Sequence, residues 1–351
     1  MLKPYFVYRG QPHTITALRI VHFLCRNQTQ LPFLLVGNST GDISFYSLKT
    51  HHLCFTISLP YKDEKMVELN SIIEIIDIKG GYFCVYNRAI GITFWKWEVQ
   101  FEQLLKKNFE KPTFLKSLAT TSYNFCKVYL LDNTNLNNEN TYFSCPTQNA
   151  ETQIVSVNLK QMSSFEMVKT LKSGRKEDVV HSLWYNYDNN TYFILAYSDG
   201  AITFNCLTNT LDSKEIWKLT PFERDNTISC IVIDNDYTSL YCSSYEGGLL
   251  RVILKYSENK EDNLRINIED ISLKKIKTKD KLQAICISNQ YYLFSAHSDG
   301  EVLLYSKKSL RLIKALNYHQ GTITSLLCTT LEDKEALFVA SNDRKISLWE
   351  V

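Results

Sequence analysis

The sequence predicts an all-β protein, a seven-bladed β-propeller closed by its own N-terminal strand. Three observations predict this fold. A strand-turn-strand pattern recurs seven times along the chain, further apolar strands flank the copies, and the two ends of the chain supply complementary parts of one blade. Sheets of four strands repeated around a ring build a propeller. We expect residues 1–351 to form this single domain.

The repeated unit is an apolar strand, a short turn with Asp or Gly, and a second strand that alternates apolar and polar residues. Glycine adopts positive φ without strain, and an aspartate side chain bonds the turn backbone, so Ser-Asp-Gly at 198–200 and 298–300 predicts tight hairpins. Successive turns lie 44 to 62 residues apart, as expected for blades of about 40–45 residues with insertions. The seven copies are 34–46, 82–95, 142–157, 192–204, 239–252, 292–305 and 337–349.

Segments on either side of these hairpins predict the remaining strands of the blades. We expect the preceding segments to be innermost and to line a central channel, and the following segments to form outer edges. The inner segments read as apolar, which argues against an enzyme with its active site at the channel mouth. The inner segments are 15–20, 72–78, 179–184, 228–233, 282–287 and 323–327, and the outer ones are 53–59, 166–171, 215–219 and 311–316.

The two ends of the chain fit together as one blade. The last blade, formed by 319–351, stops after its third strand, whereas Pro-Tyr-Phe-Val-Tyr at 4–8 is a spare strand ahead of the first inner segment. We expect residues 4–8 to pair beside 345–351 and complete the last blade. This pairing would leave the strand at 345–351 without an unpaired edge to which another chain could bind.

Composition narrows the function classes. The 39 basic residues nearly cancel 37 acidic ones and give a formal charge of +2, whereas proteins that bind phosphate backbones usually have a strong basic excess, so direct nucleic-acid binding is disfavoured. No apolar run reaches about 18 residues, so we expect no membrane-spanning segment. The ten cysteines lack CxxC spacing and read as buried, reduced thiols, which indicates the nucleus or cytoplasm. Phosphate-loop, GxSxG and HExxH motifs are absent, so we expect no catalytic residue, cofactor or metal.

Polar residues of the last blade resemble a WD repeat. His319 precedes the inner strand, Ser341 ends the second strand, Asp343 lies in the turn, and Trp349 follows six residues later. The resemblance implies a side-chain hydrogen-bond network that joins the strands of this blade. Such networks stabilise a fold only when every member is satisfied. We therefore interpret His319 and Asp343 as structural residues, not as a catalytic pair.

The ends of the chain also resemble the ASTRA-associated protein 1 family of yeasts. The residues that carry this resemblance are 4–18, 321–327 and 336–351. It implies a non-enzymatic scaffold subunit of the nuclear ASTRA complex, with protein subunits as partners. That family is linked to chromatin remodelling and to the TTT cochaperone, which matures PI3-kinase-like kinases. Two alternatives stay open, namely a propeller adaptor of membrane trafficking and one of a ubiquitin ligase.

Two features are candidates for partner contacts. The polar runs 132–140 and 256–281 are long connections, and loops on a rigid scaffold commonly carry binding function. A basic run within the second connection is either a solvated loop or a docking patch for an acidic partner or nucleic acid. Its residues are Lys274, Lys275, Lys277, Lys279 and Lys281.

Overall fold

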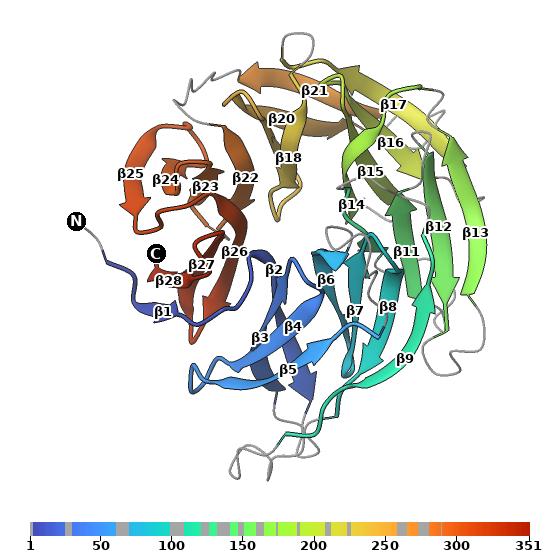
Figure 1. The fold of residues 1–351 in the computed structure, drawn as a ribbon. Helices are drawn as coiled ribbons and strands as arrows, with labels where there is room; N and C mark the ends of the chain where they lie inside the picture. Colours follow the sequence, from blue (N-terminus) through green and yellow to red (C-terminus); the bar gives the residue numbers. More distant parts are fainter. Residues whose placement is uncertain are drawn as a thin grey trace.

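Seven antiparallel sheets of four strands each, arranged in a ring, make up the described part of the protein (Figure 1). This confirms the predicted seven-bladed β-propeller. The computed structural model describes residues 3–24, 30–60, 70–98, 109–120, 126–131, 141–146, 151–158, 165–172, 175–187, 190–207, 212–222, 226–257, 265–272, 281–288 and 290–351.

In blades one to six, four consecutive strands pair in chain order, and the first of them is innermost (Figure 1). Blades one to three comprise β2 (Ile15–Leu24), β3 (Gln30–Asn38), β4 (Asp42–Ser47), β5 (Leu53–Ser58); β6 (Ile72–Lys79), β7 (Tyr82–Asn87), β8 (Gly91–Lys96), β9 (Thr113–Leu118); and β10 (Tyr129–Leu131), β11 (Thr141–Pro146), β12 (Glu151–Val157), β13 (Phe165–Lys172). Blades four to six comprise β14 (Val179–Tyr187), β15 (Asn190–Tyr197), β16 (Ile202–Leu207), β17 (Ser213–Leu219); β18 (Ile228–Ile233), β19 (Ser239–Ser244), β20 (Leu249–Ser257), β21 (Arg265–Ser272); and β22 (Leu282–Ile287), β23 (Tyr292–His297), β24 (Glu301–Ser306), β25 (Leu312–Asn317).

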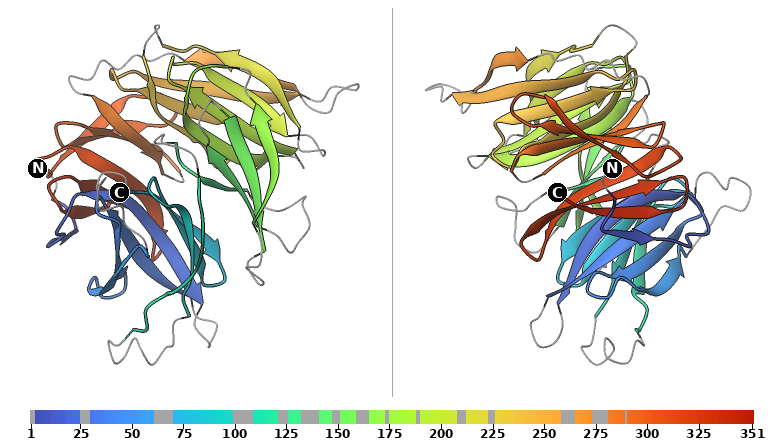
Figure 2. Two further views of the ribbon diagram at one scale, coloured as in Figure 1. Left: turned by 45° about the vertical axis from the view of Figure 1, so that its right-hand side comes forward. Right: turned by 90° about the vertical axis from the view of Figure 1, so that its left-hand side faces the viewer.

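Blade seven is built from both ends of the chain. It contains β26 (Ile323–Leu331), β27 (Lys334–Ser341), β28 (Ile346–Glu350) and, outermost, β1 (Phe6–Tyr8). In the antiparallel pairing of β1 with β28, Phe6 lies opposite Leu348 and Tyr8 opposite Ile346. The strand is shorter than the expected segment 4–8, although the Tyr5 N–H still donates to the Leu348 carbonyl at 2.7 Å. Both termini therefore lie at this blade (Figures 1 and 2).

The Ser-Asp-Gly turns adopt the geometry that their residues favour. Gly200 and Gly300 have φ of 82° and 93°, a region that other residues enter only with strain. A Cβ added at Gly300 would lie 2.6 Å from the carbonyl oxygen of His319. The Asp299 carboxylate accepts a hydrogen bond from the backbone of the residue two positions later, at 2.9 Å. The Gly and Asp residues that predicted these turns are therefore the residues that the turn geometry requires.

The apolar core is divided into layers, one between each pair of neighbouring blades in the described part of the chain. The layer between blades one and two is rich in aromatic residues. There, Phe23 and Phe45 meet Trp97 edge to face, with ring centroids 4.5 and 5.1 Å apart. Such pairs add about 0.5–1.5 kcal/mol each beyond the burial of their area. The abundance of Phe and Tyr is therefore used to join blade to blade.

One expected loop contains a strand. Residues 256–281 were predicted as a connection, but 265–272 form β21, the outer strand of blade five, and β20 extends to Ser257. The segment Arg-Ile-Asn-Ile-Glu-Asp-Ile-Ser alternates apolar and polar residues over its first part, which is the period of a strand. Its charged residues suit a position at the outer edge of a sheet.

Candidate functional site

The polar residues of blade seven form a continuous chain of hydrogen bonds. His319 Nδ1 lies 3.1 Å from both carboxylate oxygens of Asp343. On the other side of the ring, His319 Nε2 lies 2.8 Å from Ser347 Oγ, which also accepts the indole N–H of Trp349 at 2.8 Å. The chain links the segment before β26, the β27–β28 turn and β28. It therefore ties together parts of the blade that are far apart along the chain.

This arrangement resembles a Ser-His-Asp catalytic triad in its distances but not in its accessibility. Ser347 is fully buried, and its oxygen already accepts the Trp349 N–H. Burial lowers the pKa of His319, although the Asp343 carboxylate acts in the opposite direction. A neutral ring donates from Nδ1 to Asp343 and accepts the Ser347 hydroxyl proton at Nε2. A nucleophile needs a path to substrate, and this hydroxyl has none.

Ser341 takes a separate position in the same blade. Its hydroxyl donates to the Gly321 carbonyl at 2.8 Å and accepts the Asp343 N–H at 3.1 Å. The residue that connects His319 to Trp349 is Ser347, which the sequence reasoning did not single out. Residues two apart on a strand face the same side of the sheet. The position of Ser347, two before Trp349, therefore indicates that its hydroxyl can reach the indole. That the set stabilises the blade stays a prediction.

Blade two contains a partial copy of this arrangement. Its Trp95 donates the indole N–H to Thr93 Oγ1 at 3.0 Å, and Thr93 donates to the Val85 carbonyl at 3.2 Å. Trp95 and Thr93 hold the same relation as Trp349 and Ser347 do in blade seven. The pair thus occurs on the third strand of blades two and seven, β8 and β28. It belongs to the architecture of a blade rather than to a single chemical site.

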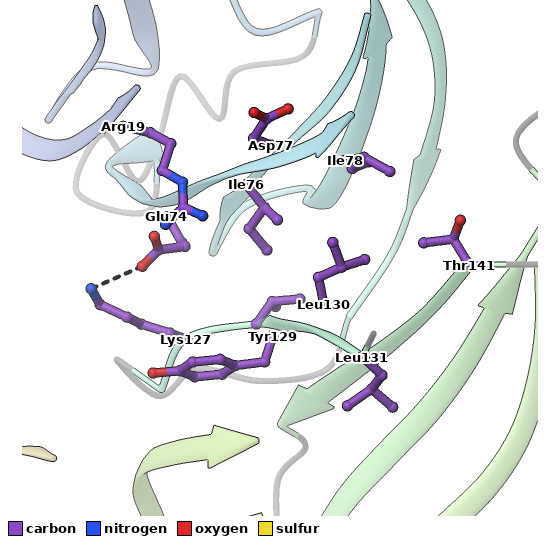
Figure 3. Close-up of a pocket in the computed structure, with 11 residues that line it drawn as sticks. Arg19, Glu74, Ile76, Asp77, Ile78, Lys127, Tyr129, Leu130, Leu131 and Thr141 are labelled. Carbon is purple, nitrogen blue, oxygen red and sulfur yellow. Dashed lines mark ion pairs between the residues drawn. The ribbon is translucent and has the colours of Figure 1, made fainter. Parts of the chain in front are cut away.

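A charged cavity of about 530 Å³ lies where blades one, two and three meet (Figure 3). Arg19 of β2, Glu74 of β6 and Lys127, which precedes β10, line it. Glu74 Oε2 and Lys127 Nζ form an ion pair at 2.9 Å, and Glu74 raises the pKa of Lys127. The Arg19 guanidinium points in the direction of the same carboxylate (Figure 3). The cluster thus connects the inner strands of three blades.

The expectation of apolar inner strands is therefore wrong for β2 and β6, which line this cavity. Besides Arg19 and Glu74, β6 carries Asp77, whose carboxylate accepts the backbone N–H of His22 from β2 at 3.3 Å. The isoleucines around Glu74 and Asp77 dominated the sequence pattern of this strand. A second cavity of about 550 Å³ shares Tyr129, Leu130 and Leu131 with the charged one and is lined largely by aliphatic and aromatic residues from the inner strands of blades three to seven. There the expectation is met.

A histidine and a cysteine also meet near the channel. His181 of β14 is buried, and its Nδ1–H donates to the Ser182 carbonyl at 3.1 Å. Cys230 Sγ of β18 lies 3.7 Å from both His181 Nε2 and the Ile285 carbonyl oxygen. Burial lowers the pKa of His181 to about 3, with Lys127 acting in the same direction, and burial raises the pKa of Cys230. Both groups are therefore neutral near pH 7, unlike an activated thiolate–imidazolium pair.

The predicted basic docking patch falls largely outside the described residues. Lys281 is described: it is exposed directly before β22, and its carbonyl accepts the Ser298 N–H at 3.0 Å. The polar run 132–140 also lies outside the described residues. The docking role of these segments stays a prediction. The other patch residues, Lys274, Lys275, Lys277 and Lys279, lie outside the described residues.

Metal-binding and membrane-spanning features were sought in the described ranges. Within them, no group of three or more His, Cys, Asp or Glu side chains is arranged to hold a metal ion. The same ranges contain no helix with the length and apolar character needed to cross a membrane. The described cysteines are free thiols, and all are buried or half-buried.

Comparisons with known proteins identify the fold. No protein-family model matches the chain, and no curated protein matches it. The crystal structure of the Saccharomyces cerevisiae Sqt1 is similar, with a TM-score of 0.63 at 11% sequence identity, over 99% of this chain and 98% of that chain. Similar chains number 1643 among solved structures. A fold so widely shared is compatible with many functions, so the likeness shows the propeller fold and selects neither a function nor a partner.

Proposed function

We propose that this protein is a non-enzymatic scaffold subunit of the nuclear ASTRA complex, and that its partners are protein subunits of that assembly. The scaffold role is supported by the burial of the side chains that would be best suited to catalysis. The residues that resemble a catalytic triad in blade seven are sealed in the sheet. Their hydrogen bonds join segments of one blade, so the surfaces of the ring are left to bind partners.

The channel-side groups support the same conclusion. Glu74 is paired with Lys127, so its charge is compensated across the blade interface. His181 and Cys230 are neutral at physiological pH, because burial lowers the pKa of the histidine and raises the pKa of the cysteine. General acid–base or nucleophilic catalysis works best with groups poised near the operating pH. These pairs are better suited to joining blades.

The resemblance of both chain ends to the ASTRA-associated protein 1 family supports the choice of assembly. The matching ends contain β1 and β28, which pair to close the ring. Because closing the ring constrains the residues of β1 and β28, part of the resemblance reflects the fold. Membership of the assembly is therefore tested directly.

Affinity purification of the protein, tagged at its own locus, followed by mass spectrometry of nuclear extract provides that test. We expect recovery of the ASTRA subunits and of the TTT cochaperone. Recovery of remodelling factors without TTT would assign the protein to chromatin, and recovery of TTT with immature kinases would assign it to kinase maturation. Recovery of coat proteins or ubiquitin-ligase subunits in place of ASTRA would contradict the assignment and favour an alternative adaptor role.

A further inference from the structure

The outer strands of six blades share a β-bulge against the third strand of their sheet, at the same place in each blade. In blades one to four the extra residue is half-buried and packs on the apolar layer shared with the next blade. In these four blades the position therefore seals the outer part of the interface with the next blade. The extra residues are Cys54, Leu115, Val168, Ile216, Glu269 and Ile313.

Blade six departs from this rule. Its bulged residue, Ile313, is 52% exposed, and so is the adjacent Leu312. The next blade is blade seven, whose outer strand β1 has three residues, whereas β25 has six. A short closing strand covers less of the neighbouring blade. The way in which the ring closes thus leaves an apolar bulge uncovered.

The uncovered bulge lies on an open sheet edge. Strand β25 is the last strand of its sheet in the described part of the chain and pairs with β24 alone. Residues 311–315 are all exposed. Tyr291, which is 66% exposed, accepts the Lys307 N–H at 2.9 Å and so lies beside the turn that leads into this strand. Exposed edges of this kind pair readily with another extended chain.

The charges at this edge have one sign. Lys308, Arg311 and Lys314 are exposed, and no ion pair joins them to an acidic residue among the described parts of the chain. Antiparallel pairing of two copies about the 312–313 midpoint would place Arg311 of each copy opposite Lys314 of the other. Like charges directly opposite one another destabilise a strand pair. The edge is therefore unsuited to its own copy and complementary to an acidic strand.

We infer that β25 docks an extended segment of a partner protein, in which acidic and apolar side chains alternate, as a fifth strand of blade six. Main-chain hydrogen bonds to the open edge hold the segment. Its apolar side chains cover Leu312 and Ile313, and its carboxylates pair with Arg311 and Lys314. This inference rests on the proposed binding function but is independent of which assembly the protein joins.

The test uses the purified full chain and a fluorescein-labelled decapeptide of alternating Glu and Val, with a Lys–Val decapeptide as the control probe. Fluorescence anisotropy measures binding, and hydrogen–deuterium exchange locates it. We expect the acidic peptide to bind, the basic one not to bind, and the amides of residues 311–317 to gain protection. Loss of two attractive charge pairs and their replacement by repulsion in R311E/K314E should weaken binding about tenfold or more. Ile313→Ser should weaken it as well.

A matched control comes from blade four. Its outer strand carries the exposed residues Lys214 and Lys218 around the half-buried bulge residue Ile216. K214E/K218E makes the same change of charge and should leave peptide binding unchanged. Melting curves confirm that each variant folds. Absence of binding, equal loss in both double variants, protection elsewhere on the ring, or a dimer in sedimentation that R311E/K314E abolishes would each overturn the inference. Because the peptide assay uses no other subunit, its failure leaves the nuclear purification result unaffected.

Discussion

Truncation of Tyr8 tests how strongly β1 holds the ring closed. Tyr8 is 2% exposed, and its ring lies 6.3 Å from Phe338 of blade seven and 5.1 Å from Tyr46 of blade one, centroid to centroid. Its hydroxyl forms a hydrogen bond with His51 Nδ1 at 2.7 Å. One side chain therefore joins the closing strand to the first and last blades. Tyr8→Ala removes all of these contacts at once.

The expected cost follows from the two kinds of contact. Truncation of a buried aromatic residue to alanine lowers the free energy of unfolding by about 3–5 kcal/mol. The lost hydrogen bond contributes about 1 kcal/mol of this, so Tyr8→Phe should cost about 1 kcal/mol by itself. Tyr5 provides the control because it is 70% exposed in the adjacent segment. Tyr5→Ala should change stability by less than about 0.5 kcal/mol.

Urea unfolding followed by circular dichroism measures these differences. If Tyr8 helps β1 to close the ring, the loss of stability should be largest for Tyr8→Ala, smaller for Tyr8→Phe and smallest for Tyr5→Ala. A Tyr8→Ala midpoint equal to that of Tyr5→Ala would refute the reasoning. It would mean that the Tyr8 side chain contributes nothing measurable to closure of the ring.

Three further predictions concern buried polar groups. Ser347→Ala leaves His319 Nε2 and the Trp349 indole N–H buried without their hydrogen-bond partner and should cost about 3 kcal/mol in urea unfolding; a loss below about 0.5 kcal/mol would contradict the network's role. His181 has a pKa of about 3 in the fold against 6.5 when free, so the unfolded chain takes up the proton first as pH falls. Between pH 6.5 and 5 this should remove about 2 kcal/mol of stability, and a pH titration of stability should be shallower for His181→Asn; parallel curves would contradict it. Lys307 forms a buried ion pair with Asp234 at 2.7 Å, so Lys307→Ala should cost about 3 kcal/mol. The exposed Lys334, which pairs with Glu350 at the surface, offers the control, since Lys334→Ala should leave stability nearly unchanged.

The fold was predictable because propeller blades repeat local signals. Each hairpin has its own turn chemistry and its own alternation, so seven copies support one another even where single copies are weak. The strand β21 was missed because its first residues, Arg265 to Glu269, mix charges with isoleucines, and such a mixture also suits a loop. The exposure of Ile313 was also beyond sequence reasoning. It depends on the length of β1, which belongs to the other end of the chain.

The polar sites were predictable only in part. His319 and Asp343 stand at family-like positions, whereas Ser347 sits in an ordinary alternating strand and becomes a partner through its register. The Glu74–Lys127 contact joins two blades, and nothing in either segment indicates which blade interface will bring them together. Contacts between blades depend on how the sheets pack, and the alternation of residues along a single strand does not predict that packing.

Sedimentation velocity of the purified chain mixed with the purified TTT cochaperone tests the proposed partnership directly. We expect a faster boundary that contains both components. We also expect Ser347→Ala, in a preparation that melts cooperatively, to enter this boundary, because Ser347 is buried inside the blade. Two separate boundaries at every concentration tested would contradict direct binding to the TTT cochaperone.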